Sequence, residues 1–144
     1  MANIIPDAFK LELLSGTHNF ASGGDTFKIA LYVTTLGPPY TTSSTVYSTS
    51  NEVSSSGTGY TTGGNELGGQ GVSVPGSNPA TVDFDNEVFS SVTLTSLGAA
   101  IYNSTNGSKL CLVIDFGGDK VATSGDFTIQ FPADAASTAI IQVA

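Results

Sequence analysis

The chain has 144 residues, and only 11% of them are charged, which is under half the share of about 25% in an average globular protein. Its formal net charge is −8, from four lysines, no arginine and twelve acidic residues. Four scattered lysines cannot form the basic face that tight nucleic-acid binding needs, and they are a poor match for an anionic membrane surface. No apolar run approaches the roughly 20 residues of a spanning helix. We therefore expect neither nucleic acid nor a membrane among the partners.

The chain opens with a short apolar arm, Met1 to Ile5, in a segment that lacks the basic start and long apolar stretch of a secretory signal peptide. Pro6 to Ser15 then reads PDAFKLELLS. Proline at a first helical position, an early aspartate and Gly16 after the last leucines predict one short helix. The face of this helix would be formed by Phe9, Leu13 and Leu14.

A helix of this length is marginal alone, so it needs a surface to lie on. We expect residues 1–16, the arm and the helix, to lie on a sheet or on a neighbouring molecule. Two adjacent isoleucines at a chain end would expose apolar surface that favours association if they were left in water. The candidate assembly contacts are therefore Ile4, Ile5 and Phe9.

His18 is the only histidine, and it follows the helix in the loop from Thr17 to Gly24. It has no cysteine at metal-ligand spacing and no Ser-x-Gly elbow near it. A zinc site or a serine–histidine triad therefore gains little support, and we expect an exposed loop histidine.

Thr26 to Thr34 is the clearest early strand, because apolar residues at every second position alternate with a second set that starts at Lys28. Gly37-Pro38-Pro39 would end this strand, since proline cannot donate to a ladder. Residues 40–71 then form a long Ser/Thr/Gly-rich excursion. It is either a surface loop with short strands near Gly59 to Thr62 and Glu66 to Val74, or a functional loop that reaches a partner.

Thr81 to Pro132 organises the rest of the chain, because apolar and polar residues alternate through most of it. The run Leu110 to Ile114 is apolar on both faces and predicts a central strand covered on both sides. Asn106-Gly107 predicts a hairpin turn. The predicted core residues are Leu112, Ile114, Phe127, Ile129 and Phe131.

The remaining strands recur at intervals of eight to twelve residues with Gly, Pro and Asn between them. They are predicted at Val72 to Val74, Ala80 to Asp85, Ser91 to Thr95, Ala99 to Asn103, Lys109 to Phe116, Asp126 to Phe131 and Ala139 to Val143. This pattern predicts one all-β domain over residues 1–144. Its architecture would be a two-sheet antiparallel sandwich, jelly-roll-like with about eight strands, with one short N-terminal helix.

Catalytic chemistry finds little support in the residues. The single cysteine, Cys111, lies in the most apolar strand and is predicted to be buried. Asp83, Asp85 and Glu87 offer carboxylates for a glycosidase, but carboxylates on the polar face of a strand are ordinary. A calcium site from Asp115, Asp119 and Asp126 matches no dedicated loop pattern. We predict no enzyme, no catalytic or cofactor-binding residues and no metal.

Two further patterns are better explained by turns. Asn103-Ser104-Thr105 and Asn106-Gly107-Ser108 fit the glycan acceptor pattern, yet both lie where a hairpin turn is predicted. The Gly-rich stretches Gly63-Gly64 and Gly68 to Gly71 lack the Lys-Ser/Thr and the strand-to-helix setting of a phosphate-binding loop.

Several segments together carry a resemblance to a known family. PDAFKLELLSG, DTFKIALYVTT, the NEV of Asn51 to Val53, GTGYTTGG, GAAIYNSTNG, LVIDFGGDK and GDFTIQFPADAASTAIIQVA follow one another along nearly the whole chain. In order and spacing they resemble a family of small tailed-bacteriophage proteins. The segment after Gly71 is shortened relative to that family.

The resemblance implies a non-enzymatic virion structural protein of the head or tail module, and no catalytic residues to carry over. We expect a capsid decoration (cement) protein that clamps junctions between major capsid subunits, after assembly in the bacterial host cytoplasm. A Thr/Ser surface suits packing against neighbours, because a hydroxyl costs less to desolvate than a charge, and a homo-trimer is expected. The alternatives are a tail-module adaptor or fibre-associated protein and, from a different class, a carbohydrate-binding β-sandwich.

Overall fold

The computed structural model describes residues 3–33 and 40–144. It is mostly β, with 43% of residues in strands and 6% in helix, and its strands form two antiparallel sheets. The elements are α1 (Asp7–Leu14), β1 (Phe27–Tyr32), β2 (Asn65–Glu66), β3 (Gly71–Ser73), β4 (Ala80–Asp83), β5 (Glu87–Asn103), β6 (Lys109–Ile129) and β7 (Ile141–Val143). The predicted all-β sandwich with one short N-terminal helix is therefore confirmed.

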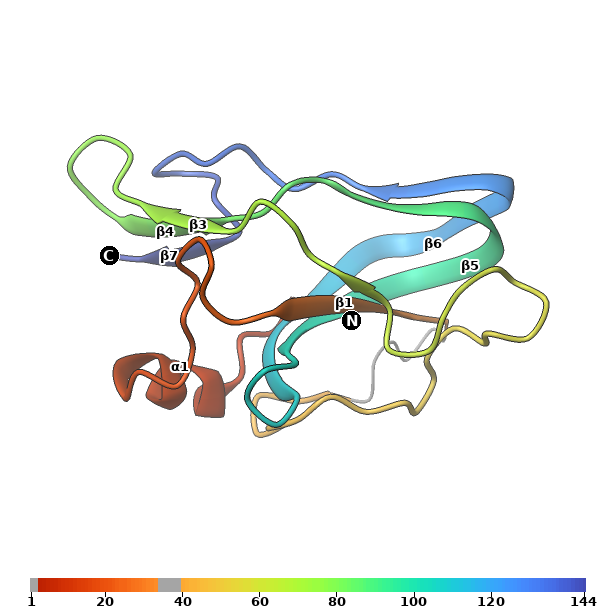
Figure 1. Cartoon of the computed structure of the whole chain (residues 1–144), viewed down its shortest axis with the longest axis horizontal. Coiled ribbons are helices and arrows are strands. Elements are labelled where there is room, and N and C mark those ends of the chain that lie inside the picture. The colour runs from red at the N-terminus through yellow and green to blue at the C-terminus, as the bar shows by residue number, and fades with distance from the viewer. Residues whose placement is uncertain (1–2, 34–39) are drawn as a thin grey trace.

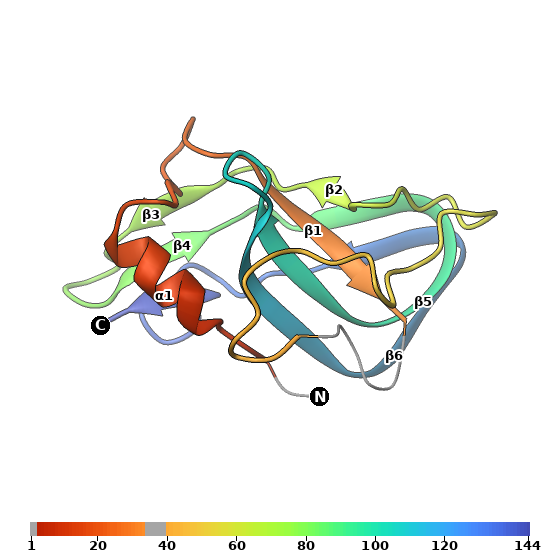
Figure 2. The same ribbon diagram turned by 90° about the horizontal axis from the view of Figure 1, so that it is seen from below.

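One sheet has the strand order β2-β1-β5-β6, and the other has the order β3-β4-β7. The long strands β5 and β6 form a hairpin that bends over on itself, so that its far half lies in a second layer above β1 (Figure 1). The predicted turn at Asn106-Gly107 joins these two strands, and Gly107 has a positive φ of 65°. Helix α1 and the three-stranded sheet lie at the same end of the molecule (Figures 1 and 2).

The sequence predicts two strands on each side of that turn, whereas the structure joins each pair into one. Breaks expected near Ser96 to Gly98 and near Gly117 to Gly125 are register shifts inside a continuous ladder. The glycines lie at bulges in the ladder. Because a bulge bends a strand pair without interrupting it, the hairpin continues into the second layer. Single-sequence periodicity cannot distinguish a bulge from a strand end.

The main core lies between the two layers and contains Phe27, Ile29 and Leu31 from the inner face of β1. Four of the five predicted core residues are buried, and Ile114 is half-buried against the same cluster. On α1, Phe9 is buried and Leu13 packs on this core, as predicted. Leu14 was expected on the same face but is 87% exposed, because it follows Leu13 by one residue and points about 100° away.

A second apolar cluster lies on the other face of the four-stranded sheet. It is built on Ala30, Tyr32, Ala100, Tyr102, Leu110 and Val113, and it is covered by Tyr40, Tyr47 and Ile4. The run Leu110 to Val113 is therefore covered on both sides, as the sequence predicts. Its position is different from the prediction, however, because β6 is the end strand of its sheet and not a central one.

Residues 40–64 run beneath the four-stranded sheet in Figure 1 and form its outer cover. They contain no long strand; Val46 and Glu52 make only isolated bridges, to Lys109 and Tyr32. Of the two short strands expected there, the one near Gly59 to Thr62 is absent from the described structure, and the one near Glu66 to Val74 corresponds only in part to the end of β2 and to β3. The segment Gly37-Pro38-Pro39, which was predicted to end the first strand, lies outside the described residues.

Candidate functional site

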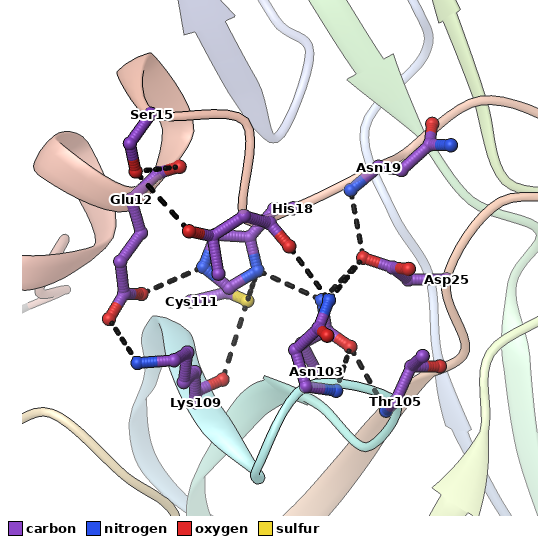
Figure 3. Close-up of polar contacts among 11 residues, drawn as sticks. Glu12, Ser15, His18, Asn19, Asp25, Asn103, Thr105, Lys109 and Cys111 are labelled. Atoms are coloured by element: carbon purple, nitrogen blue, oxygen red, sulfur yellow. Dashed lines mark hydrogen bonds and ion pairs between the residues drawn. The ribbon is translucent and has the colours of Figure 1, made fainter.

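His18 is the centre of a buried polar cluster, which contradicts the expectation of an exposed loop histidine. The residue is 7% exposed and its side chain is fully buried. Its Nε2 lies 2.8 Å from Glu12 Oε2, and its Nδ1 lies 3.0 Å from Asn103 Nδ2. Figure 3 shows the imidazole between these two side chains. We call the group of Glu12, His18, Asp25, Asn103, Asn106, Lys109 and Cys111 the His18 cluster.

The amide of Asn103 fixes the protonation pattern of this cluster. Its Oδ1 accepts backbone N–H bonds from Thr105 at 3.0 Å and Asn106 at 3.1 Å. Its NH₂ group therefore faces the other way and donates to His18 Nδ1 and, at 2.8 Å, to Asp25 Oδ2. Because Nδ1 of His18 accepts, the ring proton sits on Nε2 and is donated to Glu12.

Glu12 and Asp25 are the two carboxylates of the cluster. Glu12 also accepts from Lys109 Nζ at 3.0 Å, so it ties α1 to the start of β6. Asp25 Oδ2 accepts from the Asn19 backbone N–H at 2.9 Å and from the amides of Asn103 and Asn106. Burial by itself raises the pKa of Asp25, but these hydrogen bonds and the nearby His18 outweigh it and hold the pKa below its usual value.

Cys111 is buried as predicted, with its Sγ 3.9 Å from His18 Nδ1. A thiol beside an imidazole is the pairing that activates a cysteine nucleophile. Here the side chain has no exposed surface, and burial, followed by the charge of Glu12, raises the pKa of the thiol. A neutral, enclosed thiol cannot meet a substrate, so the cluster joins α1, the loop after it and the β5–β6 hairpin without offering chemistry.

The five tyrosines of the chain form a second polar assembly around Glu52. Tyr47 and Tyr60 donate to its two carboxylate oxygens at 2.5 and 2.6 Å, and Tyr102 donates to the Gly63 carbonyl at 2.7 Å. The hydroxyl groups of Tyr32 and Tyr40 share a hydrogen bond of 2.6 Å. Burial, with Glu52 adding to it, raises the pKa of Tyr102 to about 12 and moves the pKa of Tyr60 higher still. We call these residues the tyrosine cluster; it holds residues 40–64 on the sheet.

The candidate assembly contacts lie in different environments. Ile4 is half-buried and exchanges two backbone hydrogen bonds with Val113 of its own chain, at 2.9 and 2.8 Å. Phe9 is 2% exposed and packs against His18 and Phe20. Ile5, at 40%, is the one of the three with a largely exposed side chain.

The carboxylates considered for a glycosidase or a calcium site lie on different elements or far apart on one strand. Among residues 3–33 and 40–144, no three His, Cys, Asp or Glu side chains gather in a geometry that could hold a metal ion. Asp83 lies on β4, whereas Asp115, Asp119 and Asp126 are spread along β6. All thirteen aromatic side chains fall in the described residues, and none of them is exposed.

The His18 cluster was missed from the sequence, although one signal pointed to it. His18 and Phe20 alternate with Thr17 and Asn19 along the chain. Both His18 and Phe20 are buried. This short alternation places His18 on the inner side of its segment, but two of its partners, Asn103 and Cys111, lie 85 and 93 residues away.

A groove of about 680 Å³ runs along β6 in the described structure. Apolar side chains line most of it, including Leu112, Phe127 and Ile140.

No helix in the described residues is long and apolar enough to cross a membrane. Comparisons with protein-family models, with curated proteins and with solved structures found no match to this chain.

Proposed function

We propose that this chain is a non-enzymatic structural protein of a tailed-phage particle and acts as a capsid decoration protein. The observation that carries the proposal is that several exposed apolar side chains belong to α1 and to the three-stranded sheet, the elements that lie at one end of the molecule (Figures 1 and 2). Val72 of β3 is 59% exposed, Val143 of β7 is 50% exposed, and Leu11 and Leu14 of α1 are 69% and 87% exposed. Exposed large apolar side chains on the elements of one end suit a protein that works in an assembly.

Two further features support a structural role. The histidine and the cysteine, which are the usual carriers of nucleophilic chemistry, are buried in a fully paired network. None of the aromatic side chains is exposed, so the stacking platform required by the sugar-binding alternative finds no support in the described residues. The resemblance of the sequence to small tailed-phage proteins points in the same direction.

The proposed mechanism is passive. Several copies, as trimers, would sit over junctions between major capsid subunits, and the apolar end would bury against the shell. Because the protein would bind the assembled shell and not separated subunits, mass action would favour the closed shell. The internal pressure of packaged DNA must then break these contacts before the shell can open.

The test is binding of the purified protein to shells of the phage that encodes it, after the native copies have been stripped off. Co-sedimentation and a cryo-EM map of the re-decorated shell give the readout, and sedimentation equilibrium gives the oligomeric state. We expect Val72→Lys and Leu14→Lys to weaken binding and Val46→Lys, at an exposed position under the sheet, to leave it unchanged. Density on the tail alone, or no density on the particle, would overturn the decoration role.

A further inference from the structure

The groove along β6 lies where the two layers of the sandwich open to solvent. The first half of β6, with Leu112 and Ile114, lines one side, and the second half, with Phe127 and Ile129, lines the other. Figure 1 shows the bend that brings these two halves of one strand into different layers. The volume of about 680 Å³ lies within the range of specific binding sites, and the lining is largely apolar.

The backbone edge beside the groove has a partner along only part of its length. β6 ends its sheet, and the chain itself covers the beginning of the free side: the Leu110 N–H donates to the Thr45 carbonyl, and Val113 pairs with Ile4. In the described part of the chain, no strand pairs with the free side of residues 120–129. Val121, in this stretch, is 67% exposed. An open edge with exposed apolar side chains is a template for a further strand.

The N-terminal segment shows what kind of chain this edge accepts. Ile4 lies antiparallel to Val113 with both backbone hydrogen bonds formed, and the Asn3 side chain accepts the Asp115 N–H at 2.7 Å. Asn3 also lines the groove. The groove therefore continues from the point where an extended apolar segment already lies on the edge of β6.

Charge decides between a second copy of this chain and a different partner. The chain carries a net charge of −8, and the exposed charged residues beside the open edge are Asp119, Lys120 and Asp126, which sum to −1. Two copies meeting edge to edge would bring together two chains that each carry a net charge of −8. Ser124 has a φ of 46° at a bulge in this stretch, so two identical edges would also meet at two irregular positions.

We propose that the groove and the open edge of β6 bind an extended segment of another protein, with alternating apolar residues and basic residues at its ends. The segment adds as a strand beside residues 120–129, in the manner of β-augmentation, and places its apolar side chains in the groove. The basic residues meet Asp119 and Asp126. This inference stands on the groove and the edge alone and does not depend on the virion role.

The experiment uses the full chain, labelled with ¹⁵N, and a synthetic peptide of alternating Ile and Thr with a Lys pair at each end. We expect the amide signals of residues 120–129 and of the groove lining to shift, while those of β3 stay in place. A peptide with Glu in place of each Lys is expected to bind about tenfold more weakly or worse. Val121→Lys should weaken binding of the Lys peptide by about tenfold, and Val72→Lys should not.

The matched pair of variants separates local from general effects, because both add one positive charge at an exposed valine. Equal loss with both variants would show attraction to the acidic chain as a whole and would overturn the proposal. So would equal binding of the Lys and Glu peptides, or no binding up to about 1 mM, the weak limit of specific recognition. A shift of the groove signals by lauric acid but not by the peptide would make the groove a small-molecule site and would also overturn it.

Discussion

The His18 cluster and the β6 groove lie against the same strand, yet they differ in almost every physical property. In the cluster, every buried side-chain nitrogen and oxygen has a partner, and Asn103 alone makes four hydrogen bonds, to His18, Asp25, Thr105 and Asn106. In the groove, β6 has an uncovered edge and apolar side chains open to solvent. The residue types usually linked to catalysis are in the closed region. The open region carries residues that an ordinary core contains.

The difference teaches that residue type alone is a poor guide to function here. A histidine, a cysteine and two carboxylates lie within one network, but the network is buried and satisfied, so its consequence is stability. The groove has no distinctive residue, yet it offers surface to a partner. The comparison predicts that changes in the cluster damage folding, whereas changes at the groove damage binding more than folding.

The largest effect is expected for Asn103→Ala. The change removes all four hydrogen bonds of a fully buried amide and leaves His18, Asp25 and two backbone N–H groups to find new partners. With about 1–3 kcal/mol for each buried group left unsatisfied and partial rescue by water, we expect a loss of about 4 kcal/mol in the free energy of unfolding. Denaturant melts measure it, with exposed Thr128→Ala as the control. A loss under about 1 kcal/mol would show that the cluster is not closed.

Much of the fold on which this prediction rests was accessible from the sequence. The alternation in Phe27 to Tyr32 and the turn at Asn106-Gly107 are local signals, and α1 lies between Pro6 and Gly16 as its start and stop residues indicate. Local patterns set strand direction and the buried face, so the sandwich could be predicted.

The sites could not be predicted, because they depend on contacts between distant segments. His18 is buried by Asn103 and Cys111, 85 and 93 residues away, and nothing within its own loop reveals them. The groove exists because β6 bends instead of ending near Gly117 and Gly118, and a glycine pair in a sequence is equally compatible with a turn. The tyrosine cluster was missed for the same reason, since it combines Tyr32 of β1 and Tyr102 of β5 with tyrosines from residues 40–64.

A smaller loss is expected for Ile129→Ala, which tests the boundary between the core and the groove. Ile129 is 6% exposed, belongs to the main core and lines the groove. Core isoleucine-to-alanine changes cost about 2–5 kcal/mol, and we expect about 2–3 kcal/mol because the new space opens into the groove and does not form a closed void. Chemical denaturation gives the value. A cost below about 0.5 kcal/mol would place Ile129 outside the core.

Deleting residues 2–5 is expected to cost less again, about 1 kcal/mol. The deletion removes the two Ile4–Val113 backbone bonds and the bond that the Asp115 N–H donates to Asn3, each with a net value of about 1 kcal/mol. It also returns the backbone entropy of Asn3 and Ile4, the two residues that make these bonds, at the lower end of about 1–2 kcal/mol each. Thermal unfolding at fixed concentration gives the stability change.

The same deletion also tests whether the arm acts within its own chain or between chains. If Ile4 covers its own β6, the deleted protein loses stability while its state of association in sedimentation equilibrium is unchanged. If the arm contacts a neighbour, association is lost while monomer stability is preserved. The second result would contradict the intrachain contact and would restore Ile4 and Ile5 as assembly contacts.

The smallest effect is expected for Asp25→Asn, and it depends on pH. The hydrogen bonds to Asp25 hold its pKa in the folded protein below its usual value of about 3.9 in the unfolded chain. The unfolded state therefore binds the proton first as the pH falls. The carboxylate contributes stability that is fully present above the unfolded pKa and is lost as the pH falls through the lowered folded value. Because Asp25 is only half-buried, solvent screening keeps this contribution modest.

Asparagine at position 25 removes this pH-dependent contribution, and its carbonyl oxygen, in the place of Oδ2, is a neutral and weaker acceptor for the donors on Asn19, Asn103 and Asn106. We expect the variant to be less stable than the wild type at neutral pH and to lose less stability between about pH 5 and pH 2. Urea melts across that range give the two curves, and Asp119→Asn, at an exposed position, controls for the loss of one negative charge. Parallel curves for the wild type and Asp25→Asn would mean that the Asp25 carboxylate adds no pH-dependent stability. The closed region would then owe its stability to neutral hydrogen bonds and apolar packing alone.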